Sequence, residues 1–244
     1  MEITVRQPLP RDIEVVFLDA VGTLFEVRGS VGKIYSQFGL HHGCALDDGE
    51  TERAFVQAFR AAPPLAFPGL EGTELHEVER LWWRDIIQEI LKGKMSESTL
   101  EQYFAEIFAF FRKKEAWRVY PDTRPGLETL RRRGYRLGIV SNSDSRLEDV
   151  LAALDLNSFF DRVTVSGPTG AAKPDPAIFH KSLEAMRVPA SRALHAGDSM
   201  DEDVKGALRA GLAAVLVDRQ ERHPGWTDGF RVRNLEELCL MFGS

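Results

Sequence analysis

The stretch EVVFLDAVGTL, residues 14–24, decides how this chain is expected to fold. Its apolar residues 15–18 follow one another without interruption, which is typical of a strand buried on both faces of a parallel sheet. Asp19 ends this run, at the edge where open α/β sheets bind their ligands. Gly22 lets the chain turn sharply just afterwards. We therefore expect Asp19 at a rigid strand end with small neighbours, although an ordinary turn aspartate would leave the same pattern.

The composition is that of a globular protein. The 244 residues include 43% hydrophobic and 28% charged side chains, and the formal net charge is −6. A general binder of nucleic acid or of membrane surfaces needs a basic face, so we expect neither kind of partner. The sequence has no apolar run of transmembrane length and no signal-peptide pattern, and we expect a cytoplasmic protein. The oligomeric state stays open.

Two kinds of pattern divide the chain. From about residue 47 to residue 112, apolar residues recur at helical spacing, which predicts amphipathic helices packed on one another. After residue 117, short apolar runs alternate with helical segments, which predicts a parallel sheet with right-handed crossovers. The expected strands are residues 136–140, 162–165, 193–196, 213–217 and 230–232.

The parsimonious architecture is one doubly wound α/β core that is interrupted by an all-helical cap. The core would comprise residues 1–26 and 117–244, and the cap residues 27–116. Because the insert leaves the core just after Asp19, at the ligand-binding edge, it can serve as a lid.

Polar residues stand at or near the carboxyl ends of four predicted segments. Each alone has an ordinary structural explanation, but one parallel sheet would bring all of them to one crevice. They are Asp19 with Thr23, Ser141 with Asn142, Lys173, and Asp198 with Asp203.

These side chains suit an anionic substrate. Asp19 and Asp198 offer the oxygen ligands that Mg²⁺ prefers, and an aspartate can also act as a covalent nucleophile. Ser141 offers a hydroxyl group to an anionic oxygen. Lys173 offers a positive charge that offsets repulsion between the substrate and Asp19. The natural substrate for such a site is a phosphate monoester.

The same residues carry a family resemblance. Four ordered motifs, DAVGTL, IVSN, KPDP and GDSMDED, start at residues 19, 139, 173 and 197. They resemble the motifs of the haloacid dehalogenase-like (HAD) hydrolases, whose Rossmann-like core often carries a helical cap between the first and second motifs. The cap sequence, with Trp82 and Trp83, further resembles one subgroup of that family. The resemblance is specific for the superfamily and much less so for the substrate.

The resemblance implies roles for the catalytic and substrate-binding positions. Asp19 would be the nucleophile, and Lys173 would stabilise charge. Thr23 and Ser141 would orient the nucleophile and the transferred group, and Asn142 would help to bind the substrate.

The resemblance also implies a Mg²⁺ site. Its ligands would be Asp19, Asp198 and the backbone carbonyl oxygen of Val21, and Asp203 would support the site. The implied partner is a small phosphorylated substrate.

Val21 departs from the pattern of phosphatases in this family. They usually carry a second aspartate there, which protonates the leaving group and later activates water. Valine transfers no proton, and general acid–base catalysis typically contributes ~10² to 10⁴-fold in rate. Glu26 and either His41 or His42 are the conceivable replacements.

Two other functions compete with a phosphatase. A 2-haloacid dehalogenase displaces a halide and needs no acid at Val21, and Arg28 could hold the substrate carboxylate, but dehalogenases need no metal site. A non-catalytic or regulatory ligand-binding protein would also tolerate Val21, although the retention of Asp19, Lys173 and Asp198 argues against it. Halide release without metal would identify the dehalogenase. A gain of phosphatase activity from near zero in Val21→Asp would favour the regulatory protein.

Overall fold

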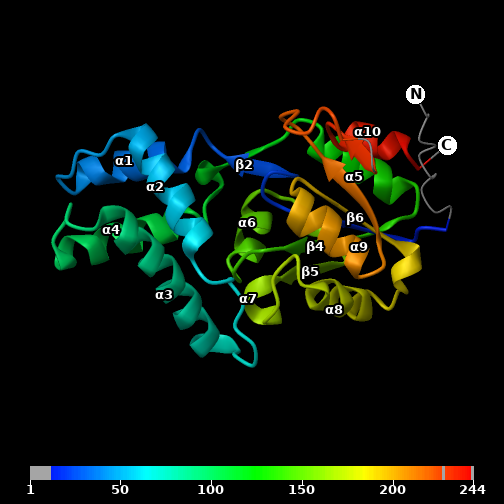
Figure 1. Ribbon diagram of the computed structural model, residues 1–244, viewed down its shortest axis with the longest axis horizontal. Coiled ribbons are helices and arrows are strands. Elements are labelled where there is room, and N and C mark those ends of the chain that lie inside the picture. The colour runs from blue at the N-terminus through cyan, green and yellow to red at the C-terminus, as the bar shows by residue number, and fades with distance from the viewer. Residues whose placement is uncertain (1–11, 227–228, 243–244) are drawn as a thin grey trace.

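A computed structural model describes residues 12–226 and 229–242, which form an α/β core with a group of helices beside it (Figure 1). The core holds one sheet of six parallel strands. Their spatial order is β5 (Arg162–Val165), β4 (Arg136–Ser141), β1 (Val15–Leu18), β6 (Ala193–Gly197), β7 (Ala213–Val217) and β8 (Phe230–Val232). The predicted doubly wound α/β class is confirmed. Residues 1–11, 227–228 and 243–244 of the expected core lie outside the described residues.

Strand β1 occupies the middle of the sheet. Leu18 pairs with Ile139 of β4 on one side and with Ala196 of β6 on the other. Successive side chains point to opposite faces of a strand, so Val16 packs into one hydrophobic cluster and Phe17 into another. Both faces of β1 are therefore buried, as its uninterrupted apolar run indicates.

Helices cover the sheet on both faces. The cluster around Val16 includes residues of α5 (Thr123–Arg132), α6 (Leu147–Ala153) and α10 (Leu235–Leu240). The cluster around Phe17 includes residues of α8 (Pro176–Met186), α9 (Gly206–Arg209) and the π-helical segment η4 (Met200–Lys205). The remaining short segments are α7 (Ser166–Thr169) and the 3₁₀ turns η2 (Asn157–Phe159) and η3 (Ala190–Arg192).

The inserted region is helical, as expected, and has a core of its own. Its helices are α1 (Val31–His41), α2 (Asp48–Ala61), α3 (Gly72–Leu91) and α4 (Glu97–Phe110), followed by the 3₁₀ turn η1 (Lys114–Ala116). Tyr35, Tyr103 and Phe104 are buried within this group. We call the group the cap. Its division from the core at residues 27 and 116 stays a prediction.

A short antiparallel ribbon connects the cap to the core. It consists of β2 (Phe25–Val27) and β3 (Trp117–Val119), and Val27 pairs with Trp117. The chain thus leaves the core along one strand and returns along its neighbour (Figure 1). Neither strand is among those expected from the sequence.

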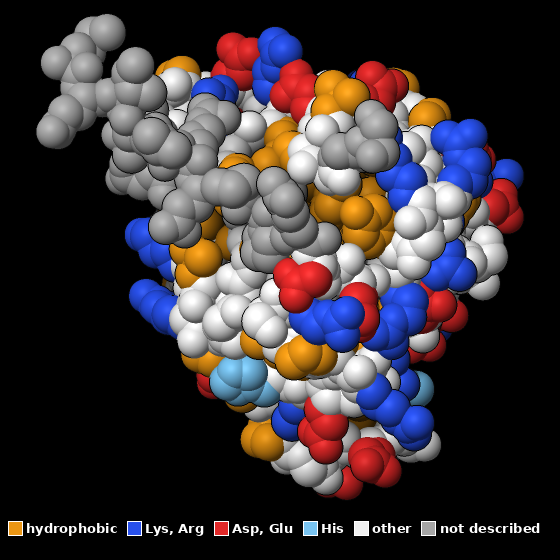
Figure 2. Space-filling model, turned by 90° about the vertical axis from the view of Figure 1, so that its right-hand side faces the viewer, with side chains coloured by type: hydrophobic (Ala, Val, Ile, Leu, Met, Phe, Trp, Pro, Cys, Tyr) orange, Lys and Arg blue, Asp and Glu red, His pale blue; other side chains and the backbone are white. Residues whose placement is uncertain are grey.

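The surface of the core on the side away from the cap mixes both signs of charge. Figure 2 shows Lys and Arg side chains interspersed with Asp and Glu over this face. Within residues 12–226 and 229–242, none of the helices is long and apolar enough to cross a lipid bilayer.

Candidate active site

The order of the strands brings three of the predicted segments together. Asp19 follows β1, Ser141 is the last residue of β4, and Asp198 follows β6. Because β1 lies between β4 and β6 and all three are parallel, their carboxyl ends share one edge of the sheet. The backbone N–H of Asp19 donates to the carbonyl oxygen of Ala196 at 2.9 Å, which fixes the chain as it leaves β1.

Lys173 connects the two carboxylates at the centre of the site. Its side chain is buried, and Nζ donates to Oδ1 of Asp19 at 2.7 Å and to Oδ1 of Asp203 at 2.6 Å. Burial alone would lower the pKa of Lys173, but the charges of Asp19 and Asp203 raise it above its usual value. The ammonium group is therefore charged at neutral pH.

Asn142 holds the backbone of Lys173 in place. Its Nδ2 donates to the carbonyl oxygen of Lys173 at 2.9 Å, and its Oδ1 accepts from the N–H of Lys173 at 2.7 Å. Nδ2 also donates to Glu202 at 3.1 Å. The amide that was predicted to bind substrate is thus already used to position the lysine.

Asp203 is anchored by three donors. Besides Lys173, it accepts from His195 Nε2 at 2.8 Å and from the N–H of Ser199 at 2.9 Å. Burial would raise its pKa, but Lys173 and His195 lower the pKa of Asp203 below its usual value. Gly197 leaves the space for this carboxylate, since a Cβ there would collide with it. Both oxygens of Asp203 are engaged, so it fits the supporting role better than that of a direct metal ligand.

His195 is the site residue that sequence reasoning missed. It lies on β6, is fully buried, and contacts Asp203. A polar residue in the middle of a buried apolar strand is the informative exception to burial patterns. The run of residues 193–197, with one histidine among small and apolar residues, carried that signal.

The carboxylates crowd one another. One oxygen from each of Asp19, Asp198 and Asp203 lies within 4.8 Å of the others. Burial, and then the charges of Asp19 and Asp203, raise the pKa of Asp198 to about 7. Burial also raises the pKa of Asp19, although Lys173 offsets part of this rise. The one positive charge of Lys173 does not neutralise the negative charges of the three aspartates. Because their carboxylate oxygens are hard donors that lie close together, the cluster fits a divalent cation such as Mg²⁺.

Gly22 allows Asp198 to approach the loop after β1. The φ angle of Gly22 is +90°, and a Cβ at this position would stand 2.6 Å from Oδ2 of Asp198. Both the backbone conformation and the space therefore require glycine.

Thr23, in the loop after β1, and Ser141, at the end of β4, are both buried. Among the described residues, Oγ1 of Thr23 has no hydrogen-bond partner. Buried polar atoms are normally paired, so this unpaired hydroxyl group is an exception in the loop after β1. The carbonyl oxygen of Thr23 is fixed by Arg219, which also pairs with Asp122 at 2.8 Å.

A family model described as haloacid dehalogenase-like hydrolase matches residues 13–211. This chain belongs to the haloacid dehalogenase-like hydrolases. Haloacid dehalogenase-like hydrolase domain-containing protein 3 of Mus musculus is 34% identical over 205 residues, which cover 83% of this chain and 81% of the relative. That protein belongs to the subgroup that the cap sequence resembles. The chain is therefore a hydrolase of this family.

Two further relatives are named as phosphatases. Phosphoserine phosphatase of Thermus thermophilus is 37% identical over 135 residues, or 54% of each protein. The crystal structure of a HAD phosphatase from Thermococcus onnurineus superposes with a TM-score of 0.66 at 26% identity, and covers 95% of this chain and 98% of that one.

Val21 of this HAD-like hydrolase lies between two cavities. Its side chain is 41% exposed and lines both a polar cavity of about 240 Å³ and an apolar one of about 310 Å³. The polar cavity also contains Glu26, Tyr120 and Asp198.

Of the residues predicted to replace the missing acid, Glu26 and His42 contact other side chains. The two oxygens of Glu26 accept from Arg118 and from the hydroxyl group of Tyr120, so both oxygens are already hydrogen-bonded. His42 lies in the cap, 3.2 Å from Glu106. In the described part of the chain, neither His41 nor His42 lines the cavities at Val21.

Arg28 does not face the site. Its guanidinium donates to the carbonyl oxygen of Trp117 at 3.1 Å, and Arg28 lines a separate surface pocket. The carboxylate-binding role considered for a dehalogenase therefore finds no support from its position.

The loop after β4 connects the site to the cap. Asp144 pairs with Arg146 at 2.6 Å and accepts from Nε1 of Trp83 on α3. Glu79, one helical turn before Trp83, accepts from the N–H of Ser145 at 3.0 Å. We call these contacts of Glu79 and Trp83 with the loop the cap latch. The latch holds the cap over the carboxyl edge of the sheet.

Proposed function

We propose that this hydrolase cleaves a small phosphate monoester through an aspartyl-phosphate on Asp19, with Mg²⁺ as cofactor. The observation that carries the proposal is the position of Asp19. It stands at the end of β1, fixed through Oδ1 by a charged, buried lysine and close to a second carboxylate, Asp198. The names of the phosphatase relatives support the same chemistry.

The metal site would use Asp19, Asp198 and the carbonyl oxygen of Val21, with Asp203 in support. A bound Mg²⁺ would supply positive charge against the phosphate and the nucleophile. The residues themselves supply the rest of the chemistry.

The first chemical step is attack by a carboxylate oxygen of Asp19 on phosphorus, with departure of the ester oxygen. Lys173 holds the carboxylate and offsets the charge that accumulates on the phosphoryl oxygens. The hydroxyl groups of Thr23 and Ser141 bind those oxygens. Asn142 acts through the backbone of Lys173.

In the second step, water attacks the aspartyl-phosphate and releases inorganic phosphate and the carboxylate of Asp19. Neither Val21 nor the engaged Glu26 supplies a proton to the first leaving group. Esters with good leaving groups are therefore better substrates than alkyl phosphates. The cap, for which we propose the bounds 27–116, encloses the leaving group.

The test is release of phosphate from 4-nitrophenyl phosphate, with and without Mg²⁺, by the wild type and by Asp19→Asn. We expect metal-dependent turnover in the wild type and none in Asp19→Asn. Equal rates for the two proteins, or a wild-type rate that is the same with and without Mg²⁺, would contradict the proposal. Asp175→Asn is a matched control, because the side chain of Asp175 caps α8 and asparagine can make the same cap; this variant should keep the wild-type rate.

A further inference from the structure

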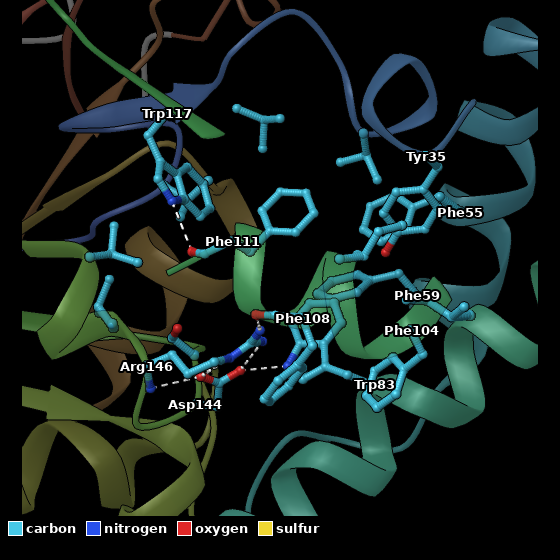
Figure 3. A pocket seen from close by; sticks show the side chains of 18 of the residues that line it. Tyr35, Phe55, Phe59, Trp83, Phe104, Phe108, Phe111, Trp117, Asp144 and Arg146 are labelled. Carbon is cyan, nitrogen blue, oxygen red and sulfur yellow. Dashed lines mark hydrogen bonds and ion pairs between the residues drawn. The ribbon is translucent and has the colours of Figure 1, made fainter. Parts of the chain in front are cut away.

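The larger cavity at Val21 is enclosed mainly by aromatic rings (Figure 3). Its volume is about 310 Å³, and both the cap and the core contribute to it. At the core end it reaches Val21, two positions after the nucleophile, and Asn142, one position after Ser141. Its aromatic lining residues are Tyr35, Phe55, Phe59, Trp83, Phe104, Phe108, Phe111 and Trp117.

The charged groups of this cavity are already paired with each other. Asp144 and Arg146 form an ion pair at 2.6 Å, and the guanidinium of Arg146 lies 3.7 Å from the centre of the Phe108 ring. Arg146 also donates to the carbonyl oxygen of Phe108 at 3.1 Å. A charged leaving group would therefore lose its hydration here, while the cavity's own charged groups are already paired with each other, which is costly.

The volume defines the size of the occupant. An engineered cavity of roughly 150 Å³ in another protein holds one benzene ring, so about twice that volume suits a group of roughly two rings. Aromatic walls favour an aromatic occupant, because ring pairs gain energy beyond their buried area.

Resting on the proposed phosphatase function, we propose that the substrate is a phosphate monoester of a phenol, an aryl phosphate, with its rings in this cavity. Attack by Asp19 breaks the bond between phosphorus and the aryl oxygen, and the electron pair leaves on a phenolate. A phenol has a pKa of about 10, against ~16 for water, so its anion leaves without a proton from the enzyme. The phenolate then takes a proton from the solvent. The sum is aryl phosphate plus water giving phenol plus hydrogen phosphate.

This assignment joins two independent observations. The apolar lining selects an aromatic group, and Val21 removes the acid that an alkyl leaving group would need. An aryl ester satisfies both.

The experiment compares three esters at fixed Mg²⁺: 2-naphthyl phosphate, phenyl phosphate and O-phosphoserine. The two aryl esters differ little in leaving-group acidity, so a difference between them reports the cavity. We expect 2-naphthyl phosphate to have about a tenfold lower KM than phenyl phosphate, and O-phosphoserine to be the poorest substrate.

A cavity variant separates binding in the cavity from general activity. Phe59→Ala removes one aromatic wall at a partly exposed position, and we expect it to abolish most of the tenfold KM advantage of 2-naphthyl phosphate. Competitive inhibition by inorganic phosphate should stay unchanged. Phe59→Leu, which keeps an apolar side chain, should restore part of the advantage, and Val56→Ala, on the same helix outside the cavity, should leave it intact.

The outcomes distinguish the two proposals. Turnover that depends on Asp19 but shows no preference for 2-naphthyl phosphate, or a preference that survives Phe59→Ala, overturns the aryl assignment alone. The absence of Asp19-dependent turnover on every ester overturns the phosphatase function and the aryl assignment with it.

Discussion

Val21 is the residue at which this active site differs most from a complete phosphatase site. Under the proposed function it stands where a proton donor is expected. It is 41% exposed, and it lines both a polar and an apolar cavity. Without a proton donor at Val21, we expect the reaction rate to depend on how readily the leaving group departs as an anion.

Val21→Asp should restore a proton donor at this position. We expect kcat/KM for O-phosphoserine to rise by roughly 10²-fold. The value for 4-nitrophenyl phosphate should change far less, since nitrophenolate needs no proton. Steady-state kinetics on both substrates measures the ratio of kcat/KM in the variant to kcat/KM in the wild type. Val21→Asn is the matched control, because its side chain has the same size but transfers no proton. An equal gain on both substrates would show that the acid was not what the site lacked.

Gly22→Ala should damage both stability and activity. The positive φ angle of Gly22 costs a residue with a Cβ about 1–2 kcal/mol, and the new Cβ would displace Asp198 from the site. Denaturant unfolding and phosphate release measure the two effects. Gly93→Ala, in the cap, shares the positive φ but has open space around it. This control should lose similar stability and keep full activity. If Gly22→Ala keeps full activity as well, the close approach of Gly22 to Asp198 is not needed for activity.

At the scale of elements, α3 contributes two side-chain contacts between the cap and the core. Glu79 and Trp83 lie one turn apart on this helix and both contact the loop after β4. Glu79 is buried, and its burial raises the pKa of its carboxyl group above the ordinary value of 4.5, although its hydrogen bonds to Ser145 lower it in part.

The raised pKa of Glu79 makes stability depend on pH. Burial disfavours the ionised form in the folded state, so the free energy of unfolding falls as pH rises from about 4.5 through the raised pKa. Glu79→Gln removes this titration. Thermal melting at pH 5 and pH 7.5 should show that the variant gains stability relative to the wild type as pH rises. A difference between the two proteins that is the same at both pH values would contradict the assignment.

At the scale of the whole molecule, the ribbon, the cap latch and the bond from Arg146 to Phe108 are among the contacts that join the cap and the core. Asp144 of the core accepts from Nε1 of Trp83, and Arg146 donates to the carbonyl oxygen of Phe108, so both core residues bind the cap beside the aromatic cavity.

Trp83→Phe should loosen the cap. It removes the donor to Asp144 while it keeps an aromatic ring, and the loss of a partner to a buried charge costs about 1–3 kcal/mol. Hydrogen exchange of residues 143–146 should become faster. Trp82→Phe is the matched control, because its Nε1 donates to Pro63 at 2.9 Å within the cap, and exchange in that loop should stay at the wild-type rate. Equal exchange in both variants would mean that Trp83 does not hold the cap.

Much of the core was readable from the sequence because its signals are local. The run before Asp19 is buried on both faces of β1, and the strand order then brings Ser141, Lys173 and Asp198 to one edge. The family resemblance is confirmed by the match over residues 13–211. The roles of the individual site residues stay predictions.

The features that the sequence did not reveal depend on long-range pairing. Strands β2 and β3 have three residues each and pair across the whole cap, so neither has a periodicity of its own. Helical spacing shows which residues of the cap are apolar, but it does not show which of them, like Phe59 and Phe111, border an open volume. His195 likewise lies on β6, whereas the residue that it contacts, Asp203, lies on η4.

The ribbon has a consequence for engineering. Val27 and Trp117 are opposite each other in an antiparallel pair, so the inserted segment starts and finishes about 5 Å apart. A module whose ends meet at that spacing should therefore fit between these positions while β1 and Asp19 keep their geometry. We expect that exchanging the insert at this ribbon changes which substrates are accepted, while the α/β core stays unaltered.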